Sequence, residues 1–186
     1  YNGGIAIVTD STLTSNSAND GGAISLAEST ASIHNSFFRY NTADNRGGVL
    51  STEDSSVTTV ELSTFLSNSA NLFGGVLYVE DYASVEVVES SIDQSAASYG
   101  GAIYAGTDGS ASLVDSSIQH STAGTYGGAI YISTDGSVSL VGSSIEHCTA
   151  SSGGAIYAGT GGSVSLAATF LSSNTASSSY GDDIYN

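Results

Sequence analysis

Short stretches of alternating apolar and polar residues recur along this chain, and Gly, Ser, Thr or Asp residues separate them. In one part of the chain these stretches are residues 129–132, 137–140 and 144–146. Alternation with a period of two between turn residues predicts β-strands, because successive side chains of a strand point to opposite faces. No segment sustains an apolar period of 3.6 residues, so the pattern does not favour helical or leucine-rich repeats.

Gly-Gly pairs divide the chain into units of nearly constant length. The pairs stand 26 or 27 residues apart, and a degenerate copy follows at Gly181. They begin at Gly21, Gly47, Gly74, Gly100, Gly127 and Gly153. Three strands in a unit of this size match one coil of a solenoid in which each strand pairs with its copy in the next coil, at a rise of ~4.8 Å. We therefore predict an all-β fold, a right-handed single-stranded parallel β-helix of about seven coils, each with 26–27 residues and three short strands.

Equivalent positions of the units predict three inward apolar columns. The columns are Ile103, Ile130 and Ile156; Leu113, Leu140 and Leu166; and Phe38, Phe65, Ile92, Ile118, Ile145 and Leu171. A structural ladder is predicted three residues after the last column, where Asn side chains can bond the backbone of their own and neighbouring turns. It contains Asn16, Asn41, Asn68 and Asn174, with Ser95, Ser121 and Cys148 in the other coils. The paired Gly fits a tight corner that requires positive φ or a close backbone approach.

The charge balance narrows the set of partners and activities. The chain has 18 Asp and Glu residues against 2 Lys and Arg and a formal net charge of −16, so we expect no nucleic-acid partner. No apolar run is long enough to predict membrane insertion. Arg39 and Arg46 are too few cations for a lyase acting on an anionic polysaccharide, and the acids recur at turns rather than converging as in a hydrolase. We expect a protein that is not an enzyme, with a polysaccharide-active β-helix enzyme as a distant alternative.

A row of tyrosines and a row of acidic residues are the candidate functional surfaces. The alternation predicts that one row of tyrosines points outward. This row is either a binding or assembly surface for glycans or other fibres, or a set of cross-strand ring pairs that reinforces the sheet. This row is Tyr78, Tyr104, Tyr131, Tyr157 and Tyr185, and a second aromatic row is Phe73, Tyr99, Tyr126 and Tyr180. Like charges ~5 Å apart repel unless cations intervene, so the acidic row is a candidate cation stripe, with Ca²⁺ as the one cofactor considered. It contains Glu28, Asp54, Asp81, Asp108 and Asp135.

Three further residues carry reactive side chains. His120 and His147 occupy the same repeat position, so they are either a surface pair or a pair of metal ligands. Cys148 belongs to the ladder column and is interpreted as a small buried residue.

Two short motifs together resemble a known family. Gly-Gly-Ala-Ile at residues 100–103 and 127–130, with Phe-x-x-Asn at residues 38–41 and 65–68, is similar to the repeat signature of the chlamydial polymorphic outer-membrane proteins. The resemblance covers nearly the whole chain. It implies a β-helix displayed at the cell surface as an autotransporter passenger, with a role in adhesion to host cells.

The two ends suggest how the coils continue. Residues 4–21 equal residues 136–153 in length, so residues 1–186 are predicted to form one β-helix segment that begins and ends mid-coil. Joining Asn186 to a following Tyr1 would complete a coil of 26 residues, so the segment is either part of a longer chain or a protomer that binds copies of itself head to tail. The expected function is an extracellular building block of a filament or fibre. The alternative is a fragment of a cell-surface adhesin.

Overall fold

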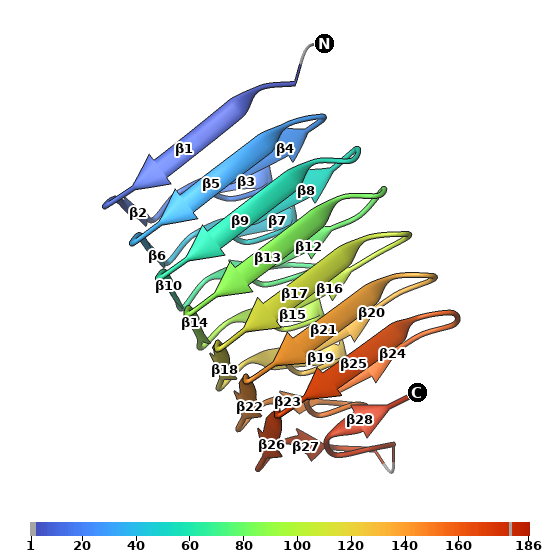
Figure 1. Ribbon diagram of the computed structural model, residues 1–186. Helices are drawn as coiled ribbons and strands as arrows, with labels where there is room; N and C mark the ends of the chain where they lie inside the picture. Colours follow the sequence, from blue (N-terminus) through green and yellow to red (C-terminus); the bar gives the residue numbers. More distant parts are fainter. Residues whose placement is uncertain (1–2, 179) are drawn as a thin grey trace.

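The computed structural model describes residues 3–178 and 180–186, and these residues form a parallel β-solenoid of about seven turns (Figure 1). Each turn contributes one strand to each of four parallel sheets, and the N- and C-terminal strands lie at opposite ends of the solenoid. The predicted all-β solenoid is confirmed, whereas its right-handed sense stays a prediction. In the described part of the chain no helix is long and apolar enough to cross a bilayer. The predicted junction between Asn186 and a following Tyr1 lies partly outside the described residues.

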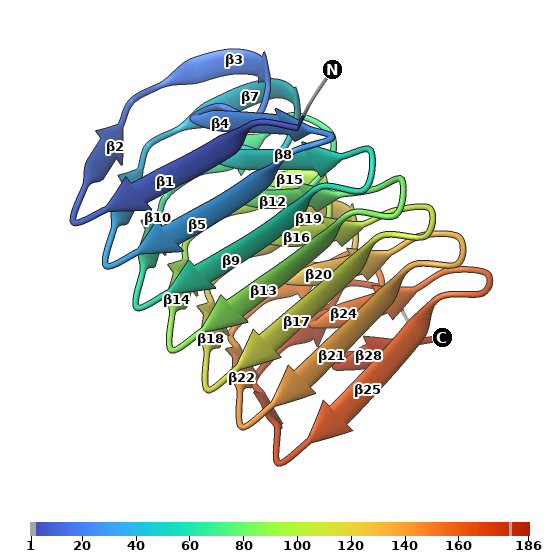
Figure 2. The ribbon, with the colours of Figure 1, turned by 45° about the horizontal axis from the view of Figure 1, so that its top comes forward.

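The four sheets are named A to D in the order in which the chain visits them. Sheet A contains β1 (Ile5–Thr9), β5 (Thr30–His34), β9 (Val57–Glu61), β13 (Ser84–Val88), β17 (Ser110–Val114), β21 (Ser137–Val141) and β25 (Ser163–Ala167). Sheet B contains β2 (Thr12–Thr14), β6 (Phe37–Arg39), β10 (Thr64–Leu66), β14 (Ser91–Asp93), β18 (Ser117–Gln119), β22 (Ser144–Glu146) and β26 (Phe170–Ser172). Figure 2 shows the strands of sheet A side by side along the solenoid.

The other two sheets flank the Gly-Gly corner. Sheet C contains β3 (Ser17–Asp20), β7 (Thr42–Arg46), β11 (Ser69–Ala70), β15 (Ala96–Tyr99), β19 (Thr122–Tyr126), β23 (Thr149–Ala150) and β27 (Thr175–Ala176). Sheet D contains β4 (Ile24–Ala27), β8 (Leu50–Glu53), β12 (Leu77–Val79), β16 (Ile103–Ala105), β20 (Ile130–Ile132), β24 (Ile156–Ala158) and β28 (Ile184–Tyr185).

The prediction of three strands per coil is wrong, because the strands of sheet C were missed. The inward residue of each of these strands is a small one, such as Ala43 in β7, Ala123 in β19 and Ala150 in β23. A single alanine among Thr, Ser, Asp and Asn residues gives no apolar alternation. The segment therefore has the composition of a turn, although neighbouring coils pair it as strands.

The predicted core columns are confirmed in register. Ile103, Ile130 and Ile156 are successive partners in sheet D and are fully buried. Phe38 and Phe65 are partners in sheet B, with parallel rings whose centroids lie 5.0 Å apart. The Leu column runs through sheet A, and the apolar residues of all coils form one continuous core. This burial is the main source of stability, because each coil covers the apolar side chains of its neighbours.

Both glycines of each corner are required for different reasons. The first glycine of every pair, and Gly181, has φ between 58° and 65°, the left-handed region that glycine adopts without strain. The second glycine approaches the next coil: a Cβ on Gly101 would lie far inside contact distance of the carbonyl oxygen of Gly128. The predicted tight corner is therefore confirmed, and its two positions meet the positive-φ and close-approach requirements separately.

Candidate functional site

The predicted tyrosine row lies on the outer face of sheet D, opposite the buried isoleucines. Successive tyrosines are cross-strand partners, and the ring centroids of Tyr104 and Tyr131 lie 5.4 Å apart. However, Tyr78 and Tyr104 are only 3% and 7% exposed. The row is therefore not a uniformly free stripe of rings: Tyr78 and Tyr104 present almost no surface to a glycan, whereas Tyr131, Tyr157 and Tyr185 are partly exposed.

The second aromatic row covers the first. The ring of Phe73 packs on Tyr104 at 4.8 Å between centroids, and the ring of Tyr126 stacks on Tyr157 at 4.4 Å. Phe73 and Tyr99 lie at the end of sheet C, next to the corner, so their side chains fold back over sheet D. Offset and tilted ring pairs contribute about 0.5–1.5 kcal/mol each beyond the area they bury. The two rows together form an aromatic layer outside the solenoid core.

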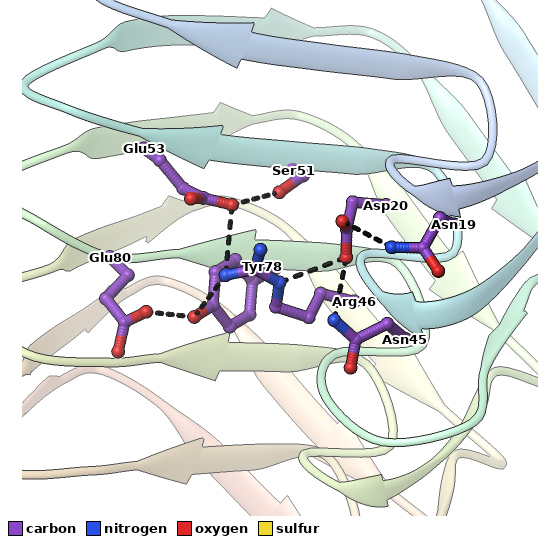
Figure 3. A network of polar contacts seen from close by, with 8 residues as sticks. All are labelled: Asn19, Asp20, Asn45, Arg46, Ser51, Glu53, Tyr78 and Glu80. Carbon is purple, nitrogen blue, oxygen red and sulfur yellow. Dashed lines mark hydrogen bonds and ion pairs between the residues drawn. The ribbon is translucent and has the colours of Figure 1, made fainter.

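Arg46 ends the covering row toward the N-terminus. It is the cross-strand neighbour of Phe73, and its guanidinium lies 4.9 Å from the centroid of the Tyr78 ring. Its Nε donates to Asp20 Oδ1 at 3.0 Å and its Nη1 donates to the Tyr78 hydroxyl at 3.2 Å (Figure 3). Nη1 also lies 3.3 Å from Glu53 Oε1. Arg46 thus caps the aromatic layer by a cation–π contact and joins three coils through hydrogen bonds and ion pairs.

Four residues complete this Arg46 network. Asn19 and Asn45 donate through Nδ2 to the two oxygens of Asp20, at 2.8 and 3.0 Å. Ser51 Oγ donates to Glu53 Oε1 at 2.9 Å, and the Tyr78 hydroxyl donates to Glu80. The acids that contact Arg46 therefore also accept hydrogen bonds from neutral donors, which fixes their positions (Figure 3).

The network keeps Asp20, Arg46 and Tyr78 in their ordinary charge states. Burial by itself raises the pKa of Asp20, but the hydrogen bonds from Arg46 and Asn19 outweigh it and leave that pKa below its usual value. Burial likewise opposes the charge of Arg46, but its bonds to Asp20 and Tyr78 raise the guanidinium pKa. Burial and the bond to Glu80 raise the pKa of Tyr78. The protonated Tyr78 phenol, the charged Arg46 guanidinium and the ionised Asp20 carboxylate therefore provide no activated nucleophile at neutral pH.

The acidic row follows the turns between sheets D and A. Its members are exposed and have φ between 50° and 57°, so they occupy the left-handed position of these turns. The residues are Glu28, Asp54, Asp81, Asp108 and Asp135. Within residues 3–178 and 180–186, no three His, Cys, Asp or Glu side chains converge as a metal would require. The row is an array of separate carboxylates, and a cation stripe along it stays a prediction.

The Asn column links coils through both backbone and side chain. The backbone N–H of Asn41 donates to Asn68 Oδ1 at 2.9 Å, and Asn68 Nδ2 donates to the Phe38 carbonyl at 3.0 Å. Asn174 repeats this arrangement with the Cys148 N–H and the Ile145 carbonyl. Each buried amide therefore satisfies polar groups in the preceding coil. Asn16, in the first coil, is exposed and donates to Asn41.

A serine ladder at the corner between sheets A and B was not predicted. The N–H of Ser36 donates to Ser63 Oγ at 3.1 Å, and the N–H of Ser63 donates to Ser90 Oγ at 2.9 Å. Ser116 and Ser143 continue the series. The sequence pattern that could have predicted this ladder is a serine two residues before each Phe or Ile of the sheet B column. It was overlooked because serine is abundant throughout the chain.

The histidines and the cysteine lie near one another in two coils. The rings of His120 and His147 stack with centroids 5.3 Å apart, and His120 Nδ1 lies 2.9 Å from Asp93 Oδ1. This is a stacked surface pair in which His120 contacts a carboxylate. Cys148 is fully buried, and burial raises the pKa of its thiol to about 11. A buried thiol with a raised pKa is a poor nucleophile.

Comparison of the chain with protein families, curated proteins and solved structures finds no match. Its identity therefore rests on the fold and the side-chain rows described above: the chain is a parallel β-solenoid of about seven turns.

Proposed function

We propose that this protein is an extracellular structural rod, whose function is to hold a stiff, elongated shape and to present repeated side chains along its length. The observation that carries the proposal is the continuous registration of four seven-stranded parallel sheets around one apolar core. Asparagine, serine and aromatic side chains then connect successive coils outside the backbone ladders. Such nearest-neighbour contacts repeat along one axis, as expected of a rod or spacer.

The charged groups fit this role better than they fit catalysis. Arg46 is held by Asp20 and Glu53, and Arg39 lies over the ring of Tyr40 at 4.7 Å. Each arginine is thus engaged within the protein. The exposed carboxylates recur from coil to coil on the turns, where their repulsion keeps rods apart and hydrated. An enzyme acting on polysaccharides is therefore not the function we propose.

The first form of this function is a head-to-tail filament, and the equivalent apolar columns of the first and last described coils support it. Leu13 and Leu171 stand in one column of sheet B, while Ile24 and Ile184 stand in one column of sheet D. At the C-terminal end Leu166 and Ile184 are 40% and 37% exposed, although their equivalents inside the rod are fully buried. Exposed edge strands and apolar column ends attract further coils.

The second form is a surface-displayed rod, the role that the resemblance to the chlamydial outer-membrane proteins implies. In that form the rod projects from a cell and binds a host surface. On sheet D the rings of Tyr78 and Tyr104 are buried, so contacts there would use the more exposed members of the aromatic layer, such as Tyr180, which is 56% exposed. Adhesion would then use the exposed turns and the open face of sheet A.

Electron microscopy of the native source, with antibodies against this chain, tests the proposal. Label on extracellular rods or fibres is the expected result, and label confined to the cell interior would contradict it. An axial repeat of about 34 Å, seven coils at ~4.8 Å, identifies the filament. Isolated rods attached to the surface identify the displayed form.

A further inference from the structure

The second glycine of each corner faces the next coil toward the C-terminus. A Cβ built on any of these glycines would lie well under 3.0 Å from the carbonyl oxygen of the second corner residue in the following coil. The glycines are Gly22, Gly48, Gly75, Gly101, Gly128 and Gly154. Real Cβ atoms do not approach a backbone oxygen so closely, and backbone atoms cannot move aside as a flexible side chain can. Another coil can therefore follow in this register only when the second corner residue of the preceding coil is glycine.

Asp182 stands at this position in the last coil. The N–H of Gly154 donates to the Gly181 carbonyl, just as the N–H of Gly128 donates to the Gly153 carbonyl, so the corner keeps its regular register. By repeat geometry, the Cβ of Asp182 occupies the place that the carbonyl oxygen of a further coil would need. The obstacle is thus a steric clash of the Cβ atom, and it does not depend on whether the carboxylate is ionised.

The carboxylate of Asp182 also occupies the edge of sheet C. The N–H groups of Thr175 and Ser177 donate back to the preceding coil, so the N–H of Ala176, between them, faces the open side. Asp182 Oδ1 accepts this N–H at 2.9 Å. The side chain thus takes the hydrogen bond that a further strand would otherwise accept.

Asp183 places a second carboxylate at the end of a core column. Its equivalents Ala129 and Ala155 are fully buried beneath the following coil, whereas Asp183 is exposed and its Oδ1 accepts from Asn174 Nδ2 at 3.0 Å. A further coil would enclose this carboxylate in the apolar core. Burying a carboxylate without a cationic partner is strongly unfavourable.

We propose that Asp182 and Asp183 close the C-terminal end of the solenoid to axial stacking. The N-terminal end has glycine at Gly22 and fits a preceding coil whose own second corner residue is glycine. The C-terminal coil of a second copy of this chain does not meet that requirement. The inference goes beyond the proposed structural role, and it selects the displayed rod over the head-to-tail filament.

The test compares the association of four purified proteins by sedimentation velocity and negative-stain electron microscopy. They are the native chain, Asp182→Gly/Asp183→Ala, Asp182→Asn/Asp183→Asn, and Asp108→Gly/Asp135→Gly. Physiological salt screens the repulsion between acidic rods. Circular dichroism first establishes that each variant retains the strand signal and cooperative melting of the native chain.

We expect the native chain to remain a single rod at all concentrations. Asp182→Gly/Asp183→Ala should lose the monomer boundary as concentration rises and form thin axial fibres, because it restores the glycine-alanine corner. Asp182→Asn/Asp183→Asn keeps both Cβ atoms without the charge, so it should stay monomeric.

The turn variant removes the same number of carboxylates away from the end. It is a matched control because Gly161 already stands at the position equivalent to Asp108 and Asp135, so it should fold and stay monomeric. Axial fibres of the native chain would overturn the inference while leaving the structural role intact. Fibres of the Asn variant would also overturn it, because charge would then be the obstacle. If Asp182→Gly/Asp183→Ala folds but remains monomeric, the two aspartates are not what closes the end.

Discussion

The outer faces of sheets A and D follow the same alternating pattern but meet different surroundings. On sheet D, Tyr104 points away from the core yet is only 7% exposed, because Phe73 and its neighbours fold over it from the corner with sheet C. On sheet A, Ser112 and Ser139 also point outward, and they line a shallow open groove. Among residues 3–178 and 180–186, no aromatic row reaches across sheet A. Alternation thus gives the direction of a side chain, whereas exposure depends on what the adjacent segment places above it.

The largest effect should come from breaking the inner face that both sheets share. Ile130→Asp would place a carboxylate in the fully buried column of sheet D, without a cation nearby. We expect the free energy of unfolding to fall by at least about 4 kcal/mol, or the chain not to fold. Ser139→Asp, on the outer face of sheet A, should change it by less than about 0.5 kcal/mol. Equal melting shifts in thermal denaturation would contradict the assigned register.

Truncating one ring in the aromatic layer of sheet D and one on an exposed turn tests whether the layer packs as described. Tyr104→Ala removes a ring that contacts Phe73, Tyr78 and Tyr131, so we expect a loss of about 3 kcal/mol in chemical denaturation. Tyr82 is 72% exposed on a turn, and Tyr82→Ala should cost less than about 0.5 kcal/mol. Similar losses for the two variants would mean that the aromatic layer does not pack as described.

A smaller effect should follow from removing one hydroxyl of the Arg46 network. Tyr78→Phe keeps the ring but leaves Glu80 without its donor and Arg46 without one acceptor. We expect a loss of about 1 kcal/mol in the free energy of unfolding. Tyr157→Phe, in the same row but outside the network, is the control and should be nearly neutral. A larger loss for Tyr157→Phe would place the important hydroxyl elsewhere.

The smallest effect concerns acid pH. The folded state lowers the pKa of Asp20 below 3.8, so the stability that Asp20 contributes is present above this pH and is lost as the pH falls through the folded pKa. Asp20→Asn should therefore reduce stability at pH 7 by less than about 1 kcal/mol, and the difference from the native chain should narrow below pH 3.8. Urea denaturation at several pH values measures this difference. A gap that widens on acidification would contradict the assigned sign.

The candidate rows show how far repeat positions can predict a site. The position of each tyrosine followed from the spacing of the Gly-Gly pairs, and the structure places all five in one row. The burial of Tyr78 and Tyr104 could not be predicted, because the covering residues lie at the end of sheet C, whose strands lack an apolar pattern. Arg46 was recognised only as one of two cations. Its contacts with Asp20, Glu53 and Tyr78 depend on coils stacking in a register that joins residues up to 32 positions apart.

The sequence by itself determined the solenoid, its coil length and its apolar columns, because repetition makes every coil present the same side chains to the same neighbours. Only the tertiary structure decided that each coil has four strands, that Tyr78 and Tyr104 are covered, and that the carboxylate of Asp182 accepts the N–H of Ala176. These features depend on the direction of the backbone at the corners. A Gly-Gly pair indicates a corner, but the turn angle and the coil that each missing Cβ faces are set by how successive coils stack.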